Sequence, residues 1–150
     1  AAIYDNLSAA PGTSLRLESL VEGGTYKALV VPKNAQTGPV QLVLWRDLDV
    51  PIAVGTPVSL TFANPLQRAL LRFDGVPGQL VSIQLGSPTW STGGSLGVFN
   101  VTGSAILSTS FGTTAAVFNP PALTQTGPHT MQIIPASGAT GTVTVDLLNR

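Results

Sequence analysis

Few side chains in this sequence could carry out chemistry. Among its 150 residues there is one histidine, His129, and there is no cysteine, so thiolate nucleophiles, thiolate metal sites and disulfides are absent. A Ser-His-Asp site would require His129 to lie beside a serine and an aspartate. His129 aligns with Tyr26 in an internal repeat set out below. We therefore predict that His129 is a structural strand residue on an outer face or rim, and we expect neither enzymatic activity nor a cofactor.

The carboxylates are equally sparse. Asp47 and Asp49 form the most closely spaced acidic pair, and with Asp5 and Glu22 they could resemble a calcium-bridged linker. Two neighbouring carboxylates are too few for a cation that takes six to eight oxygen ligands, so we favour a solvated connector and predict no metal site. No pair of carboxylates is typical of a glycosidase.

Trp45 and Trp90 are the residues that a carbohydrate-binding module would use, because sugar rings stack on open aromatic faces. Trp90 is the better candidate, since it lies in a polar loop, residues 87–94, where nothing local buries it. Trp45 ends an expected strand and aligns with Leu148, which is typical of a packing position. We therefore expect that any ligand contact is made by Trp90 before Trp45.

The composition excludes several classes of protein. Seven basic and seven acidic residues give a net charge of zero, and 43% of residues are hydrophobic against 9% charged. This balance excludes a disordered chain and leaves no basic stripe for nucleic acid. Apolar runs such as Ala28–Val31 are far shorter than the roughly 20 residues of a membrane-spanning helix, so we expect no membrane insertion.

The positions of these residues depend on short strands. Sixteen glycines and twelve prolines are spread through the chain and interrupt every candidate helix. The stretches between them alternate apolar and polar side chains, which predicts an all-β, antiparallel, jelly-roll-like β-sandwich. The expected strands are Arg16–Leu20, Tyr26–Val31, Val40–Trp45, Val58–Phe62, Ala69–Phe73, Leu80–Leu85, Ser95–Asn100, Ala105–Thr109, Thr130–Ile134 and Thr142–Leu148.

An internal repeat sets the domain boundaries. Residues 24–32 (GTYKALVVP) align with residues 127–135 (GPHTMQIIP), and the same offset places Thr37-Gly38 over Thr140-Gly141. We interpret each copy as a hairpin in which a proline ends the first strand and a Thr-Gly pair begins the returning strand. The prediction is one and a half modules: the C-terminal half of a repeat in residues 1–46, a connector in 47–53 and a complete repeat in 54–150.

Three segments carry a family resemblance. Residues 70–83 (LLRFDGVPGQLVSI), 123–130 (LTQTGPHT) and 139–145 (ATGTVTV) resemble tandem β-sandwich repeats of large secreted bacterial proteins. Such repeats often lie beside RHS or YD-repeat regions and are similar to pre-peptidase C-terminal domains. The resemblance implies a spacer, adhesive or ligand-binding sandwich at the cell surface or outside the cell, and it does not imply catalysis.

The half-repeat predicts assembly. If residues 1–46 supply only the end of a sandwich, their apolar faces and strand edges need a partner. We expect structural or adhesive self-association, through strand complementation between chains or between neighbouring repeats, which would propagate head to tail as a filament. Two alternatives stay open: a carbohydrate-binding module that uses Trp90 to hold a glycan, and a pre-peptidase-like appendage of a secreted enzyme.

Overall fold

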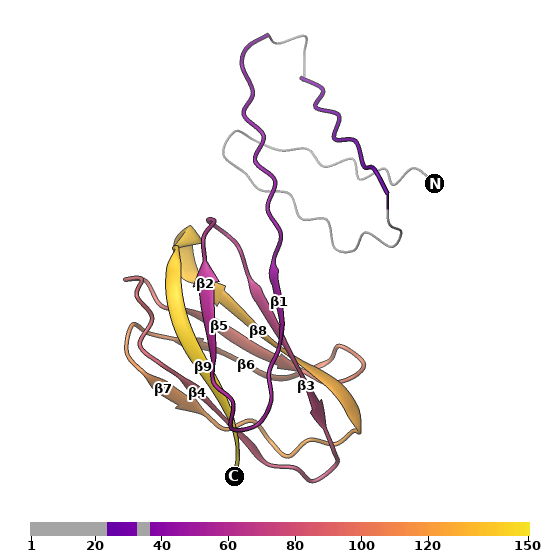
Figure 1. Cartoon of the computed structure of the whole chain (residues 1–150), viewed down its shortest axis with the longest axis vertical. Coiled ribbons are helices and arrows are strands. Elements are labelled where there is room, and N and C mark those ends of the chain that lie inside the picture. Colours follow the sequence, from indigo (N-terminus) through magenta and orange to yellow (C-terminus); the bar gives the residue numbers. More distant parts are fainter. Residues whose placement is uncertain (1–23, 33–36) are drawn as a thin grey trace. The chain divides into compact units, whose positions relative to one another are not determined.

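The computed structural model describes residues 24–32 and 37–150 (Figure 1). The chain divides into two units, Ala1–Val43 and Leu44–Arg150, and the second unit holds every helix and strand of the described residues. The expected strand Arg16–Leu20 and the residues Asp5 and Glu22 lie outside the described residues.

The Leu44–Arg150 unit is built from two sheets. The five-stranded sheet has the order β1-β3-β8-β5-β6, with only the β1–β3 pair parallel, and the four-stranded sheet has the antiparallel order β2-β9-β4-β7. The strand bounds are β1 Leu48–Pro51, β2 Val58–Phe62, β3 Ala69–Gly75, β4 Val81–Leu85, β5 Gly94–Phe99, β6 Ala105–Phe111, β7 Ala116–Phe118, β8 Gly127–Pro135 and β9 Gly141–Asn149.

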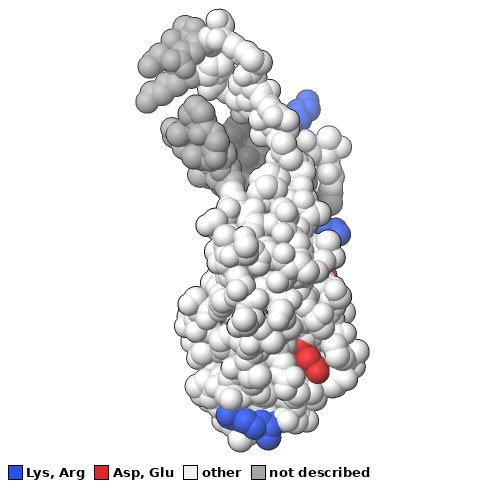
Figure 2. All heavy atoms as spheres, turned by 90° about the vertical axis from the view of Figure 1, so that its left-hand side faces the viewer, with Lys and Arg blue, Asp and Glu red and all other residues white. Residues whose placement is uncertain are grey.

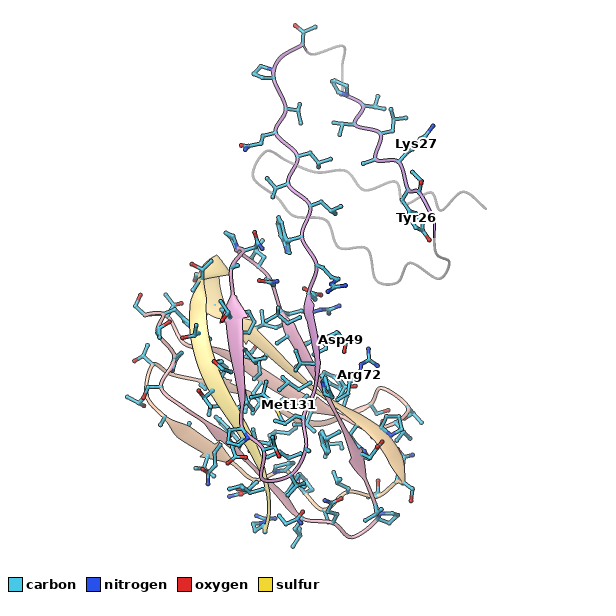
Figure 3. All side chains as sticks on the ribbon, viewed as in Figure 1. Tyr26, Lys27, Asp49, Arg72 and Met131 are labelled. Atoms are coloured by element: carbon cyan, nitrogen blue, oxygen red, sulfur yellow. The ribbon has the colours of Figure 1, made fainter. Side chains whose placement is uncertain are left out.

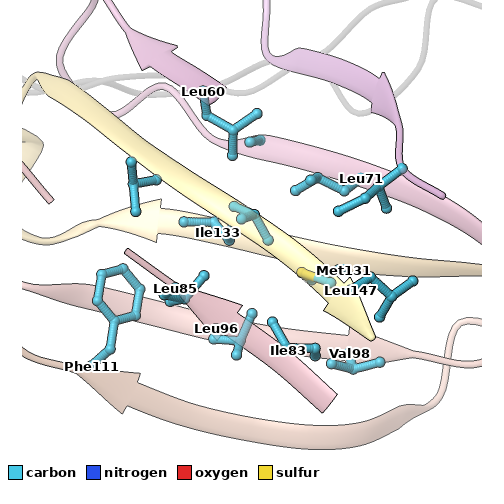
Figure 4. Packing of buried hydrophobic residues seen from close by; sticks show 14 of the residues in the cluster. Leu60, Leu71, Ile83, Leu85, Leu96, Val98, Phe111, Met131, Ile133 and Leu147 are labelled. Carbon is cyan, nitrogen blue, oxygen red and sulfur yellow. The ribbon is translucent and has the colours of Figure 1, made fainter. Parts of the chain in front are cut away.

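Alternation along the strands explains why the two sheets pack. In β4 the side chains of Val81, Ile83 and Leu85 are buried, and the residues between them point outward. Side chains from both sheets meet in one core, which includes Leu71, Met131 and Ile133 from the five-stranded sheet and Leu60 and Leu147 from the four-stranded sheet (Figure 4). Burial of this apolar surface, at roughly 25 cal/mol per Å², is the main force that holds the sheets together.

The strand order confirms the predicted all-β sandwich. Strands β2 to β9 pass from one sheet to the other at every connection except the β5–β6 hairpin, and their orders β3-β8-β5-β6 and β2-β9-β4-β7 are those of an eight-stranded jelly roll. In this arrangement the last two strands, β8 and β9, each lie between two earlier strands. Strand β1 is an addition at the edge beside β3.

The hairpin interpretation of residues 130–148 is wrong. Strand β8 belongs to the five-stranded sheet and β9 to the four-stranded sheet, so the two strands do not pair with each other. The short 3-10 turn η2, Ala136–Gly138, carries the chain across the edge of the sandwich, with positive φ angles at Ser137 and Gly138. Glycine and proline end a strand equally well before a hairpin and before a crossing, so this punctuation does not distinguish the two.

Two strands lie where the sequence predicted none. Residues 48–51 were expected in a connector, yet they form β1, whose backbone pairs with β3 from Leu48↔Ala69 to Pro51↔Arg72. Residues 116–118 form the short edge strand β7 beside β4. The two strands have only four and three residues, too few for an alternation of apolar and polar residues to stand out in the sequence.

The segments Tyr26–Val31 and Val40–Trp45 were expected to be strands. Within residues 24–32 and 37–47 the structure has neither helix nor strand, and most apolar side chains are exposed, including Leu29, Val31, Leu42 and Leu44. The module boundaries at residues 46 and 54 remain a prediction.

Candidate functional site

His129 is a core residue and does not lie on an outer face or rim. Its side chain is 0% exposed in β8 and stacks on Phe73, with the ring centroids 5.5 Å apart. The Nδ1 atom lies 2.9 Å from the carbonyl oxygen of Gly127, and the buried Nε2 atom has no hydrogen-bond partner among the described residues. Since a carbonyl oxygen can only accept, Nδ1 donates to it, and the ring is held in this orientation. The contacts of the His129 ring with described residues are the Gly127 carbonyl oxygen and the Phe73 ring, neither of which belongs to a Ser-His-Asp arrangement.

Trp90 is also buried, contrary to the expectation that nothing local covers it. It is 5% exposed, and its Nε1 donates to the carbonyl oxygen of Gly93 over 2.6 Å. Its ring meets Phe62 edge-on at 5.5 Å and Phe111 at 6.4 Å. The loop folds inward because Thr89 exchanges hydrogen bonds with Thr142 at the start of β9. Trp90 therefore packs into the core of the sandwich, and neither face of its ring is open to a sugar.

Asp47 fixes the entry of the chain into β1. Its carboxylate accepts from the Nε atom of Arg68 at 2.6 Å and from the backbone N–H of Arg68 at 3.1 Å. The Gln67 side-chain amide donates to the carbonyl oxygen of Arg46 at 2.7 Å. We call residues 46, 47, 67 and 68 the entry clasp. It ties the backbone before β1 to the start of β3, so Asp47 acts as a structural anchor.

Asp49 forms a second ion pair on the outer surface of β1. Arg72 donates from Nε at 2.8 Å and from Nη2 at 3.0 Å to the two carboxylate oxygens (Figure 3). These hydrogen bonds lower the pKa of the Asp49 carboxyl and raise that of the Arg72 guanidinium. Both carboxylates of the expected acidic pair are thus held by guanidinium groups. In the part of the chain that the structure describes, no three His, Asp or Glu side chains gather as metal ligands.

Trp45 is half-buried and lines a shallow concavity at the entry of the chain into β1. Polar side chains surround it, among them Asn64, Gln67 and Arg46. An aromatic ring with amide groups nearby is the kind of surface on which a sugar can stack and form hydrogen bonds. The order of the two tryptophans as ligand candidates is therefore reversed, because Trp45 is the one with accessible surface.

Among the described residues, most of the large apolar side chains that are exposed lie in residues 24–32 and 37–44. The repeat aligns Val40, Leu42 and Leu44 with Val143, Val145 and Leu147 of β9. The β9 residues are buried, whereas their counterparts are exposed, with Leu44 at 87%. Contiguous exposed apolar side chains of this kind mark sites of protein contact. The repeat predicted strands in these residues, and the described ones form none.

Comparison with known proteins gives the fold and leaves the family open. No protein-family model and no curated protein sequence matches the chain. None of the described helices is long and apolar enough to cross a membrane. The solved structures that are similar to the chain include the following two. One is PliG of Aeromonas hydrophila, a periplasmic inhibitor of g-type lysozyme, with a TM-score of 0.54 and 14% identity over 70% of this chain and 98% of that one. The other is the pre-peptidase C-terminal domain of a Bacillus anthracis collagenase, with a TM-score of 0.54 and 11% identity over 70% of this chain and 99% of that one. The matched 70% of the chain therefore has the fold of these two domains.

Proposed function

We propose that this chain is a non-catalytic β-sandwich module of a secreted or cell-surface protein, and that it joins copies or neighbouring repeats through its N-terminal segment. The observation that carries the proposal is the exposure of Val40, Leu42 and Leu44, whose counterparts in β9 form the core. Leaving such side chains in water costs roughly 1.5–3 kcal/mol each compared with burial. A partner that covers them would recover part of this free energy.

The jelly-roll topology supports the same conclusion. Residues 24–32 and 37–46 align in sequence with β8 and β9, the last two strands of the jelly roll. Each of these strands has a neighbouring strand on both sides. In the Leu44–Arg150 unit those two positions are filled by β8 and β9. The N-terminal segment must therefore find its partner strands at an edge or in another module. The proposed RHS or YD-repeat context, with repeats in tandem, fits this requirement.

Sedimentation velocity over micromolar to near-millimolar concentrations tests the proposal. The full chain is expected to self-associate, and a variant with Val40→Thr, Leu42→Thr and Leu44→Thr is expected to sediment as a monomer. Val76→Thr, which changes an exposed valine outside the segment, is the matched control. A monomer at every concentration for the unmodified chain would refute self-association.

A carbohydrate-binding function is the second candidate, and the concavity beside Trp45 is the observation that favours it. The relevant variant is Trp45→Ala, with the buried Trp90 left intact. Binding on a glycan array that disappears in this variant would support the candidate. An array with no bound glycan would remove it.

A further inference from the structure

The four edge strands of the sandwich differ in how well they are protected against pairing with another chain. Strand β1 has four residues, ends in Pro51 and carries the Asp49–Arg72 ion pair. Strand β7 has three residues and is followed by Asn119 and two prolines. Short length, proline and charge are the features that protect natural sheet edges.

Strand β6 lacks all of these features. It has seven residues, Ala105–Phe111, with no proline and no charged side chain. The chain carries no Asp, Glu, Lys or Arg between Asp74 and Asp146, so no ionic side chain from the neighbouring loops can protect this edge either. Figure 2 shows few charged side chains on the visible face of the sandwich. The fourth edge, β2, is shorter, with five residues that begin directly after Pro57.

The register of β6 shows which of its residues face the core. Leu107 lies opposite Val98, and Thr109 lies opposite Leu96, both of which are buried inner-face residues. Ser108 and Ser110 therefore point to the outer face. A strand added beside β6 would continue both faces of the five-stranded sheet.

Residues 40–44 (VQLVL) have the properties of a strand that could be added. They carry no charge, their side chains are exposed, and their counterparts in β9 already form a strand. The alternative stretch, residues 24–32, contains Lys27, whose ammonium would have to be accommodated in the pairing. Pairing of residues 40–44 with β6 would place no ionic group at the new interface, so it carries no charge desolvation cost.

We propose that residues 40–44 of one copy of this chain pair with β6 of a second copy and extend its five-stranded sheet by one strand. This proposal rests on the proposed function and names the surface that accepts the N-terminal segment. Main-chain hydrogen bonds supply the affinity in this mode of recognition, and alternate side chains supply specificity. Each copy has one donor segment and one acceptor edge, so the contact is head-to-tail and can continue from copy to copy.

Disulfide trapping tests the pairing directly, because the chain has no cysteine of its own. A Gln41→Cys chain is mixed with a Ser108→Cys chain under mild oxidation. The matched control replaces the second chain with Ser59→Cys, which puts the thiol on the other open edge, β2. Linked heterodimer is expected to form several times faster with Ser108→Cys than with Ser59→Cys.

A second pair of variants tests the edge without a cross-link. Ser110→Lys puts a charge on the exposed outer face of β6 and is expected to weaken self-association by at least about tenfold, because an edge lysine opposes pairing. Thr61→Lys makes the same change on β2 and is expected to leave self-association unchanged. Thermal unfolding of both variants shows whether the module stays folded.

The outcomes separate this proposal from the proposed function. Self-association that persists in Ser110→Lys, or trapping that favours Ser59→Cys, overturns the assignment of β6 while self-association itself stands. A chain with both Gln41→Cys and Ser108→Cys that closes its own disulfide at high dilution overturns the role of a second copy. A monomer at all concentrations overturns both proposals.

Discussion

Residues 127–149 and 24–46 follow one sequence pattern and reach different structures. In the first region β8 and β9 each pair with strands on both sides, and Met131, Ile133 and Leu147 are fully buried. In the second region the described residues form no strand, and the aligned side chains Val30 and Leu44 are exposed. The alternation is the same, so it is the presence of neighbouring strands that decides whether the pattern becomes a sheet.

The two regions also share their glycine positions. Gly127 and Gly141 have φ angles of 122° and 146°, and their counterparts Gly24 and Gly38 have angles of 158° and 159°. Positive φ is accessible at low cost only to glycine. The local backbone requirement is therefore set by the sequence in both copies, while packing against other strands occurs in only one of them.

Truncation of the aligned leucines gives the largest expected difference. Leu147→Ala removes a fully buried side chain and is expected to lower the free energy of unfolding by about 3 kcal/mol. Leu44→Ala shortens a side chain that is 87% exposed and is expected to change the free energy of unfolding by less than about 0.5 kcal/mol. Urea unfolding at low protein concentration measures both. Equal effects would mean that Leu44 is packed in the monomer, which would contradict the contrast.

The aligned glycines give the next largest difference. A Cβ at Gly141 would lie 2.5 Å from Oγ1 of Thr89 and 3.2 Å from the Trp90 ring, and the positive φ adds strain. Gly141→Ala is expected to lower the free energy of unfolding by about 2 kcal/mol. A Cβ at Gly38 would meet no atom within 4 Å, so Gly38→Ala should lower the free energy of unfolding by much less than Gly141→Ala does. A thermal midpoint that falls in Gly141→Ala alone would confirm the difference.

Exchange of the aligned aromatic residues tests the core around β8. His129→Tyr forces a larger ring against Phe73 and Leu123 and is expected to destabilise the sandwich by about 1–2 kcal/mol. Tyr26→His changes a side chain that is 43% exposed, so a smaller effect is expected. Urea midpoints of the two variants give the comparison. A neutral His129→Tyr would show that the core has room for the repeat's other aromatic residue.

The smallest expected effect is the loss, at low pH, of the stabilisation that the Asp49–Arg72 ion pair gives to the fold. This pair holds the chain just after residue 46. The folded-state pKa of Asp49 lies below its ordinary value of 3.8, so the pair stabilises the fold above about pH 4 and this contribution is lost as the pH falls through the folded-state pKa. Because both side chains are more than half exposed, the contribution is about 0.5 kcal/mol or less. A double-mutant cycle with Asp49→Asn and Arg72→Gln should give a coupling energy at pH 7 that is lost as the pH falls through the folded-state pKa of Asp49. Coupling that persists in acid would contradict the ionic origin.

The strands with clear alternation were predictable. Val58–Phe62 was predicted with its observed bounds, and the strands around Leu71, Ile83 and Val145 were found within a few residues. The strands β1 and β7 were not predictable, since they are held by their neighbours β3 and β4 more than by any pattern of their own. The same limit applies to Asp47 and Asp49, because their arginine partners lie 21 and 23 residues away.

The sequence alone determined the class of fold, the approximate positions of the clearly alternating strands, the absence of cysteine chemistry and the similarity in sequence between residues 24–46 and 127–149. These properties follow from local composition and from side-chain alternation. Only the tertiary structure decided that β8 and β9 lie in different sheets, that His129 is enclosed beside Phe73 and that Trp90 closes one end of the core. Burial depends on which distant segments come together, and this information is not contained in the spacing of residues within any one segment.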